Sequence, residues 1–92
     1  MNVAWSLQAE QDLTAIVEFI AKDDIQAALE IDVLLQEAAE RLIPFPGKGK
    51  PGRVPGTREL IAHAHYILVY TLTGDAIHIV TVLHTSRQWP PE

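Results

Sequence analysis

The sequence predicts a small α+β domain with the element order β-α-α-β-β-β, in which a helical hairpin packs on one face of a small, mainly antiparallel sheet. Apolar residues recur every three to four positions through the first half of the chain, which is the helical period. A Pro/Gly-rich segment interrupts this pattern at residues 43–56. Beyond it lie short apolar runs rich in β-branched and aromatic residues, which are typical of strands. A chain of 92 residues is expected to form a single domain over residues 1–92.

The N-terminal segment predicts a strand followed by a helix. Residues 2–5 are partly apolar and form the predicted strand. Ser6 is a good N-cap, because its hydroxyl can accept a hydrogen bond from a free N–H of the first helical turn. The helix is predicted over residues 7–21. Its apolar stripe is formed by Ala9, Leu13, Ile16, Val17 and Ile20.

A second helix is predicted over residues 25–42. Asp23 and Asp24 interrupt the first helix, and either carboxylate can cap the second one. The connection is so short that the two helices must form an antiparallel hairpin. The second apolar stripe is formed by Ala28, Ile31, Leu35, Ala38 and Leu42. Packing against the sheet is the main expected use of both stripes, and a groove for a partner is the alternative.

Residues 43–56 are predicted to form one loop, because Pro44 lacks an N–H and clashes with the preceding helical turn. The glycines and lysines of this loop superficially suggest a phosphate-binding loop. The order GxxxxGK[ST] is absent and no strand precedes the segment, so the sequence does not support that function. Three strands are predicted after the loop, over residues 57–62, 66–72 and 76–84.

The last two strands are predicted to form a tight hairpin. Gly74 and Asp75 indicate a two-residue turn of type II′, in which glycine supplies the positive φ. A regular ladder from this turn then places Thr73 opposite Ala76, Tyr70 opposite Ile79, Val69 opposite Val80, Leu68 opposite Thr81 and His65 opposite His84. Both faces of the hairpin are largely apolar, so it is expected to lie in the centre of the sheet.

The charges divide the chain into two unlike parts. Residues 1–40 carry nine acids and one base, whereas residues 41–92 carry six bases and three acids, and the net charge is −5. The chain has no cysteine, which excludes disulfides, thiolate metal sites and thiol nucleophiles. The apolar runs are shorter than the roughly 18 residues that indicate a membrane span. The default expectation is a soluble, cytoplasmic protein that does not bind membranes.

Basic side chains gather where the loop meets the first hairpin strand and again at the C-terminal end. Arg53 and Arg58 lie at the first place, and His84 and Arg87 lie at the second. Arginine binds phosphate or carboxylate bidentately, and histidine transfers protons near neutral pH. A regular meander puts Arg58 and His84 at opposite ends of the sheet, which argues against one compact acid–base site.

Two other uses of these polar residues remain open. The arginines are also suited to ordinary ion pairs, with Glu37 or Glu40 as partners. The histidines raise the question of a metal site, because His63 and His65 share a strand face and His84 approaches them across the hairpin. With no cysteine and a single acid nearby, we expect neither a metal site nor a cofactor.

The ordered set of motifs resembles the RelE/ParE toxins of type II toxin–antitoxin systems, and the resemblance spans nearly the whole chain. The matching segments are Asp-x-x-Ala-Ala (Asp24, Ala27, Ala28), Gly-Arg-Val-Pro-Gly-Thr-Arg-Glu-Leu (52–60), Tyr-Ile-Leu-Val-Tyr (66–70) and Val-Leu-His-x-x-Arg-x-Trp-Pro (82–90). The resemblance implies a RelE/ParE-like fold and a small toxin that is neutralised by an antitoxin encoded beside it.

Two branches of this family differ in their chemistry. RelE-type members cut mRNA on the ribosome, whereas ParE-type members inhibit DNA gyrase. The Gly-Thr-Arg-Glu-Leu motif and the His-x-x-Arg-x-Trp ending are similar to the ParE branch. Ile67 also favours it, because ribonucleases of the family often carry arginine at this place. The net charge of −5 disfavours docking on ribosomal RNA, whose phosphates reward positive charge.

The resemblance therefore implies a ParE-like toxin that inhibits DNA gyrase by binding. The alternatives are a RelE-like mRNA endoribonuclease and an inactive antitoxin-binding module. The expected target-binding residues are Arg53, Arg58, His84, Arg87 and Trp89. The catalytic group of a ribonuclease would be Arg58, His84 and Arg87. The expected antitoxin-binding residues are Leu13, Val17, Ile20, Ile31 and Leu35. A homodimer or a hetero-oligomer with the antitoxin is the expected assembly.

Overall fold

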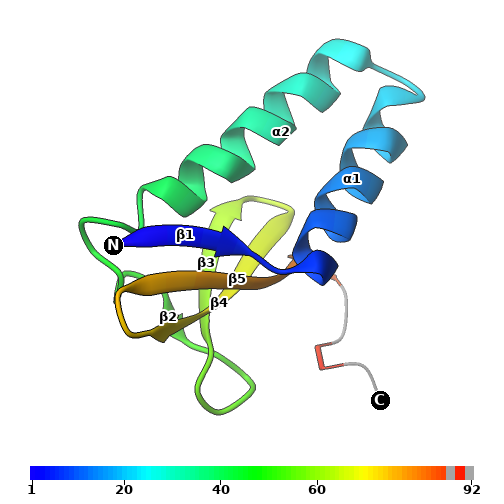
Figure 1. Cartoon of the computed structure of the whole chain (residues 1–92). Coiled ribbons are helices and arrows are strands. Elements are labelled where there is room, and N and C mark those ends of the chain that lie inside the picture. Colours follow the sequence, from blue (N-terminus) through cyan, green and yellow to red (C-terminus); the bar gives the residue numbers. More distant parts are fainter. Residues whose placement is uncertain (87–88, 91–92) are drawn as a thin grey trace.

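The computed structural model describes residues 1–86 and 89–90, and it confirms the predicted α+β fold. The elements are β1 (Asn2–Trp5), α1 (Leu7–Ala21), α2 (Ile25–Glu40), β2 (Lys50–Pro51), β3 (Arg58–His63), β4 (Tyr66–Thr73) and β5 (Ala76–His84). The strands form one sheet in the order β1-β5-β4-β3-β2. The two helices form a hairpin that covers one face of this sheet (Figure 1). None of the helices in the described ranges is long and apolar enough to cross a membrane.

Both helices begin at the caps that the sequence predicts. The Ser6 hydroxyl accepts the Ala9 N–H, and the Asp24 carboxylate accepts the Ala27 N–H, each at 3.0 Å. α2 ends at Glu40, two residues earlier than predicted. Its last carbonyls are satisfied by tighter i→i−3 hydrogen bonds, which end the helix before Pro44 removes a donor.

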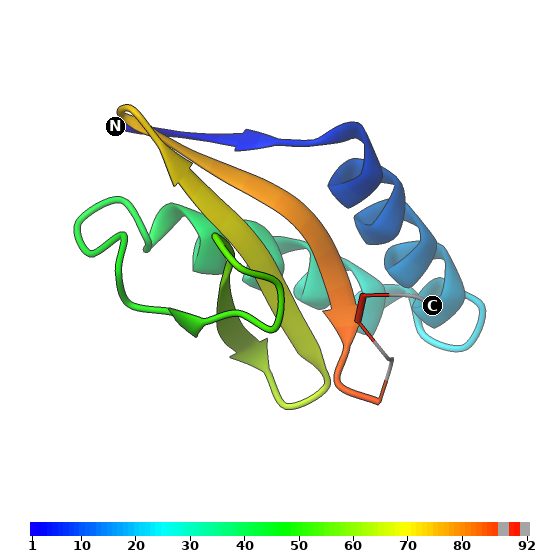
Figure 2. The same cartoon turned by 90° about the horizontal axis from the view of Figure 1, so that it is seen from below.

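The sheet is mixed, because β1 pairs with β5 in parallel while the other neighbours are antiparallel. β4 and β5 are central, as their apolar faces predict. The two-residue strand β2 was not predicted, since it lies inside the Pro/Gly loop and pairs only Lys50 with Glu59 and Pro51 with Arg58. In Figure 2 the N-terminus lies beside the β4–β5 turn, where the Asn2 N–H donates to the Asp75 carbonyl at 3.2 Å.

The predicted register of the β4–β5 hairpin is confirmed near the turn and is wrong beyond it. Thr73 faces Ala76 and Tyr70 faces Ile79, but the pairing then shifts by one residue at Val80. Beyond this shift the register gives Val69 opposite Thr81, Leu68 opposite Val82 and Tyr66, rather than His65, opposite His84. A bulge of this kind leaves one residue unpaired and reorients the strand.

Contacts from the start of α1 explain the bulge. The Ser6 hydroxyl donates to the Val80 carbonyl at 2.8 Å, and the Asp12 carboxylate accepts the Val82 N–H at 3.0 Å. The Thr81 hydroxyl also donates to Asp12. These side chains satisfy backbone groups that a regular ladder would have paired elsewhere. Side-chain contacts between residues about 70 positions apart thus set the register, which a local turn rule does not include.

Two apolar clusters lie on opposite faces of the sheet. The larger one lies under the helices, and its fully buried members include Leu35, Leu42, Leu68, Tyr70 and Ile79. The smaller one lies on the other face and consists of Ile67, Val69 and Leu83, with Val80 and Trp89 packed against them. The helices therefore cover one face of the sheet, while the other face is covered in part, with Trp89 on this cluster and Ile61 of β3 63% exposed.

Gly74→Val should destabilise the fold by about 1 kcal/mol or more. Gly74 has φ of +61°, and a Cβ at this position meets no atom within 4 Å, so the cost arises from the backbone conformation and not from a clash. Gly74→Asn is the matched control, because asparagine tolerates this conformation better. Urea unfolding of both variants measures the difference. Equal stability of the valine variant and the wild type would contradict the turn geometry.

Candidate functional site

Arg53 forms a structural ion pair with a buried carboxylate. Glu59 on β3 is almost fully buried, and it accepts the Arg53 backbone N–H at 2.9 Å and the guanidinium Nε and Nη2 at 3.3 Å each. The predicted pairing of Arg53 with Glu37 or Glu40 is wrong, since Glu37 pairs with Arg41 at 3.8 Å. The Arg53 side chain is 43% exposed, but its charge is committed to Glu59, which would otherwise be buried without a partner.

The Arg58 side chain also forms hydrogen bonds within the protein, in this case to the loop that follows α2. Its Nη1 donates to the Gly49 carbonyl at 2.8 Å and to the Gly47 carbonyl at 3.3 Å. The buried Tyr70 hydroxyl holds the same loop, because it donates to the Pro46 carbonyl at 2.7 Å and accepts the Gly49 N–H at 2.8 Å. We call residues 44–50 the anchored loop. Arg58 therefore positions the backbone of the anchored loop, and its predicted ion pair with Glu37 or Glu40 is wrong.

The structure separates the predicted site residues. Arg58 lies in the row with Tyr70 and Ile79, whereas His84 lies in the row with Tyr66 and His63. The two rows are four residues apart along β4, or roughly 13 Å. This confirms that Arg58 and His84 lie at opposite ends of the meander. Arg87 lies outside the described residues.

Trp89 is half-buried against the sheet. It packs on the cluster formed by Ile67, Val69 and Leu83, on the face away from the helices. Its indole Nε1 is buried and has no hydrogen-bond partner among the described residues. The predicted role of Trp89 in target binding stays a prediction, and the side chain has a structural use as a cover for the sheet.

Three histidines and a tyrosine gather at one end of the sheet. The ring centroids of His65 and His84 are 5.6 Å apart and the rings are stacked, while Tyr66 meets His84 edge-on at 5.6 Å. His63 lies 5.6 Å from His65 and 5.8 Å from Tyr66. Sequence reasoning grouped the histidines but missed Tyr66, because the one-residue register shift brings it opposite His84. Among the described residues no group of three or more His, Cys, Asp or Glu side chains is placed to hold a metal ion.

Backbone donors fix two of these imidazoles. The Nδ1 of His84 accepts the Ser86 N–H at 3.1 Å and lies 2.7 Å from the Ser86 hydroxyl. The Nδ1 of His63 accepts the His65 N–H at 3.1 Å. An Nδ1 that accepts a backbone N–H is unprotonated, so the proton of each neutral ring is on Nε2. The arrangement can position imidazoles for hydrogen bonding or proton transfer through Nε2.

The helices expose an apolar stripe other than the predicted one. Leu35 is 0% exposed in the main core, which confirms packing as the main use of its stripe, and its role in antitoxin binding stays a prediction. Leu13 and Ile31 are partly buried against the same core, and Val17 and Ile20 are half-buried. The exposed apolar residues on α2 are instead Ile25, Leu29 and Val33. Sequence reasoning could have found them, because they recur every four residues on the side of α2 away from Ala28 and Leu35.

Leu29 and Val33 line a surface groove of about 440 Å³ on α2. The remaining lining residues are Gln26, Glu30, Leu34, Glu37 and Arg41. A smaller depression of about 170 Å³ lies between the helices, and its lining includes Leu13 and Val17. The predicted antitoxin residues therefore contribute to the smaller depression, while the larger groove lies on the outer face of α2.

Comparisons with known proteins agree with this fold. The family model described as ParE toxin of type II toxin-antitoxin system, parDE, matches residues 3–89. Toxin Y4kP of Sinorhizobium fredii is 38% identical over 97% of this chain and 93% of its own length. Toxin RelE2 of Caulobacter vibrioides is 32% identical over 94% of this chain and 97% of its own length.

Solved structures give the same result. The chromosomal ParDE system of P. aeruginosa superposes with a TM-score of 0.80 at 25% identity, over 91% of this chain and 95% of that one. A chain of the E. coli DinJ–YafQ toxin–antitoxin complex superposes with a TM-score of 0.55 at 20% identity, over 95% of this chain and 94% of that one, and shares the fold. The chain belongs to the ParE toxin family and is a toxin of a type II toxin–antitoxin system.

Proposed function

We propose that this toxin acts by binding DNA gyrase rather than by cutting RNA. The observation that carries the proposal is the separation of the predicted catalytic group. Arg58 and His84 lie at opposite ends of the meander, and Arg58 is occupied by the carbonyls of Gly47 and Gly49. Acid–base catalysis at a phosphate needs its groups within hydrogen-bond reach of the reacting atoms. Binding has no such requirement, because its contacts can be spread over a surface.

The charge distribution supports the same proposal. The helical half is strongly acidic and the net charge is −5, which is unfavourable for docking on ribosomal RNA. The resemblance of the Gly-Thr-Arg-Glu-Leu motif to the ParE branch adds to this argument. Arg58 begins β3 and faces Pro51 of the edge strand β2.

A ribosome-dependent mRNA endoribonuclease is the second candidate. The cluster of His63, His65, Tyr66 and His84 favours it, because imidazole and phenol groups are suitable proton carriers for phosphodiester cleavage. One related protein is named RelE2, after the other branch of the superfamily. In this candidate His84 is the catalytic acid or base and the cations come from elsewhere in the chain.

His84→Gln should leave toxicity largely intact, because glutamine keeps hydrogen bonding but cannot relay a proton. The wild type and the variant should both stabilise gyrase–DNA breaks, and neither should cut mRNA in a translation extract. His78→Gln is the matched control, since His78 is an exposed histidine on β5 outside the cluster. Codon-positioned mRNA cleavage by the wild type, lost about 10²–10⁴-fold in His84→Gln and kept in His78→Gln, would establish the ribonuclease instead.

We propose that the antitoxin docks on the groove of α2. Leu29 and Val33 are exposed there, and Glu30 and Glu37 lie beside them. An amphipathic helix with apolar anchors and basic flanks complements such a surface. Two of the solved neighbours are the toxin–antitoxin complexes DinJ–YafQ and YoeB–YefM, which supports an antitoxin as the partner.

A further inference from the structure

The anchored loop, residues 44–50, is held rigidly although it lies at the surface. Side chains from β3 and β4 bind four of its backbone groups: Arg58 contacts the carbonyls of Gly47 and Gly49, and Tyr70 contacts the Pro46 carbonyl and the Gly49 N–H. The Lys48 N–H also donates to the Phe45 carbonyl at 3.0 Å, which closes a turn within the loop. A surface loop with this many fixed backbone groups loses little conformational entropy when it binds a partner.

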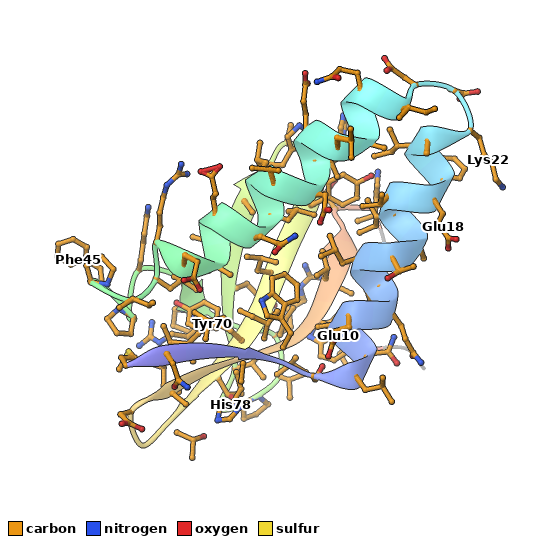
Figure 3. All side chains as sticks on the ribbon, turned by 45° about the horizontal axis from the view of Figure 1, so that its top comes forward. Glu10, Glu18, Lys22, Phe45, Tyr70 and His78 are labelled. Atoms are coloured by element: carbon orange, nitrogen blue, oxygen red, sulfur yellow. The ribbon has the colours of Figure 1, made fainter. Side chains whose placement is uncertain are left out.

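The side chain at the tip of this loop is apolar and points into solvent. Phe45 is 70% exposed, between Pro44 and Pro46. Figure 3 shows Phe45 projecting from the end of the molecule opposite Lys22, whereas Tyr70 lies inside beneath α2. A surface hollow of about 630 Å³ lies along the loop and is lined by residues 44–48. A rigid backbone that presents an exposed phenyl ring has the form of a preorganised binding anchor.

The charges around Phe45 are positive. Between Glu40 and Glu59 the chain has five bases and two acids, a net charge of +3. Glu59 is buried and paired with Arg53, so it contributes little to the outer surface. Lys48 and Lys50 flank the anchor and are exposed. Residues 1–39 carry eight acids and one base, so this end of the molecule differs in sign from the helical hairpin.

We propose that the anchored loop is the principal target-binding element of the toxin, with Phe45 inserting into an apolar pocket of an acidic protein surface. This inference rests on the proposed function and names the part of the molecule that performs it. It replaces Arg53 and Arg58 as direct target contacts, because both side chains hold the protein together. Their role is to position the loop.

A protein surface fits this element better than a nucleic acid does. Nucleic-acid affinity rests on many phosphate contacts and on a domain that is basic as a whole, whereas this chain has a net charge of −5. Phe45 is enclosed by prolines on both sides in sequence, which favours insertion into a matching pocket over stacking with a series of bases. Lys48 and Lys50 supply the polar rim that surrounds such an anchor.

Phe45→Ala should weaken gyrase inhibition and growth inhibition about tenfold or more, because a buried aromatic anchor contributes more than 1 kcal/mol to a protein interface. Phe19→Ala is the matched control, since Phe19 is also a phenylalanine that is 70% exposed but lies on the acidic helix α1. It should inhibit within about twofold of the wild type. Melting temperatures of both variants should equal that of the wild type, which separates lost binding from lost folding.

The readouts distinguish failure of this inference from failure of the proposed function. If Phe45→Ala inhibits growth as strongly as the wild type, the loop is not the binding element, whatever the target is. If the wild type inhibits growth but not gyrase, the proposed function is wrong, while loss of growth inhibition in Phe45→Ala still supports the loop. If the wild type binds a labelled single-stranded oligonucleotide tightly and Phe45→Ala does not, the proposal that the partner is a protein is wrong. The double variant Lys48→Glu with Lys50→Glu should lose inhibition as well, and full activity of it would contradict the acidic surface.

Discussion

Leu35→Ala should lower the free energy of unfolding by about 2–5 kcal/mol, because it deletes a large apolar side chain from a site that cannot refill. Leu35 is 0% exposed and lies in the main core between the helices and the sheet. In a domain of this size such a loss lowers the melting temperature by at least about 8 °C. Thermal unfolding followed by circular dichroism measures it. A small change would mean that Leu35 is a surface residue, as an antitoxin contact requires.

Leu29→Ala is the control, because it makes the same chemical change on the exposed face of α2. Leu29 is 53% exposed on α2 and lines its outer groove. Stability should change by at most about 0.5 kcal/mol, as for other surface substitutions. Antitoxin affinity should fall instead, since the proposed docking site loses an apolar anchor. Unchanged antitoxin affinity in Leu29→Ala would mean that the antitoxin binds another face of the toxin.

Gly49→Ala should destabilise the fold by about 1–3 kcal/mol through overpacking and should loosen the anchored loop at the same time. A Cβ on Gly49 would lie 2.7 Å from the Tyr70 hydroxyl oxygen and 2.9 Å from the Glu59 carbonyl oxygen. The second contact is backbone of β3, which cannot rotate away. We therefore expect the variant to lose the Tyr70 hydrogen bonds and to show reduced toxicity beyond its loss of stability.

Gly47→Ala, two residues away in the same loop, should be close to neutral or slightly stabilising. A Cβ on Gly47 meets no atom within 4 Å, and replacing glycine restricts the unfolded chain. Denaturant unfolding of the two alanine variants tests the loop geometry, because the chemical change is the same and only the surroundings of the added methyl group differ. Equal stability of Gly49→Ala and Gly47→Ala would show that Tyr70 does not fill the space beside Gly49.

Local signals in the sequence predict most of the fold. Ser6 and Asp24 cap their helices as expected, since an N-cap depends on residues within one turn. Gly74 has its positive φ for the same local reason. The strand β2 was missed because it has only two residues and lies inside a Pro/Gly-rich segment, and the bulge at Val80 was missed because it depends on a hydrogen bond to Ser6, 74 residues away.

The candidate site was harder to predict than the fold. Arginines at a loop–strand junction indicate a binding surface, but Arg53 and Arg58 are used for Glu59 and for loop carbonyls. A sequence does not reveal that a carboxylate is buried, and so it does not reveal that an arginine is already committed. Leu35 and Leu29 have equal hydropathy and opposite exposure, but here the helical period of α2 separates them, because it puts them on different faces. Their assignment depends on which helix face meets the sheet.

The parallel pairing of β1 with β5 also determines when the sheet can be completed as the chain is made. The segments that this pairing joins are at opposite ends of the chain, with Ser6 bonded to Val80 across 74 residues. Contacts of such long range form late, since the intervening chain must be in place before they can close. β1 therefore has no partner strand until β5 has been made, and the sheet is completed only when translation is nearly finished.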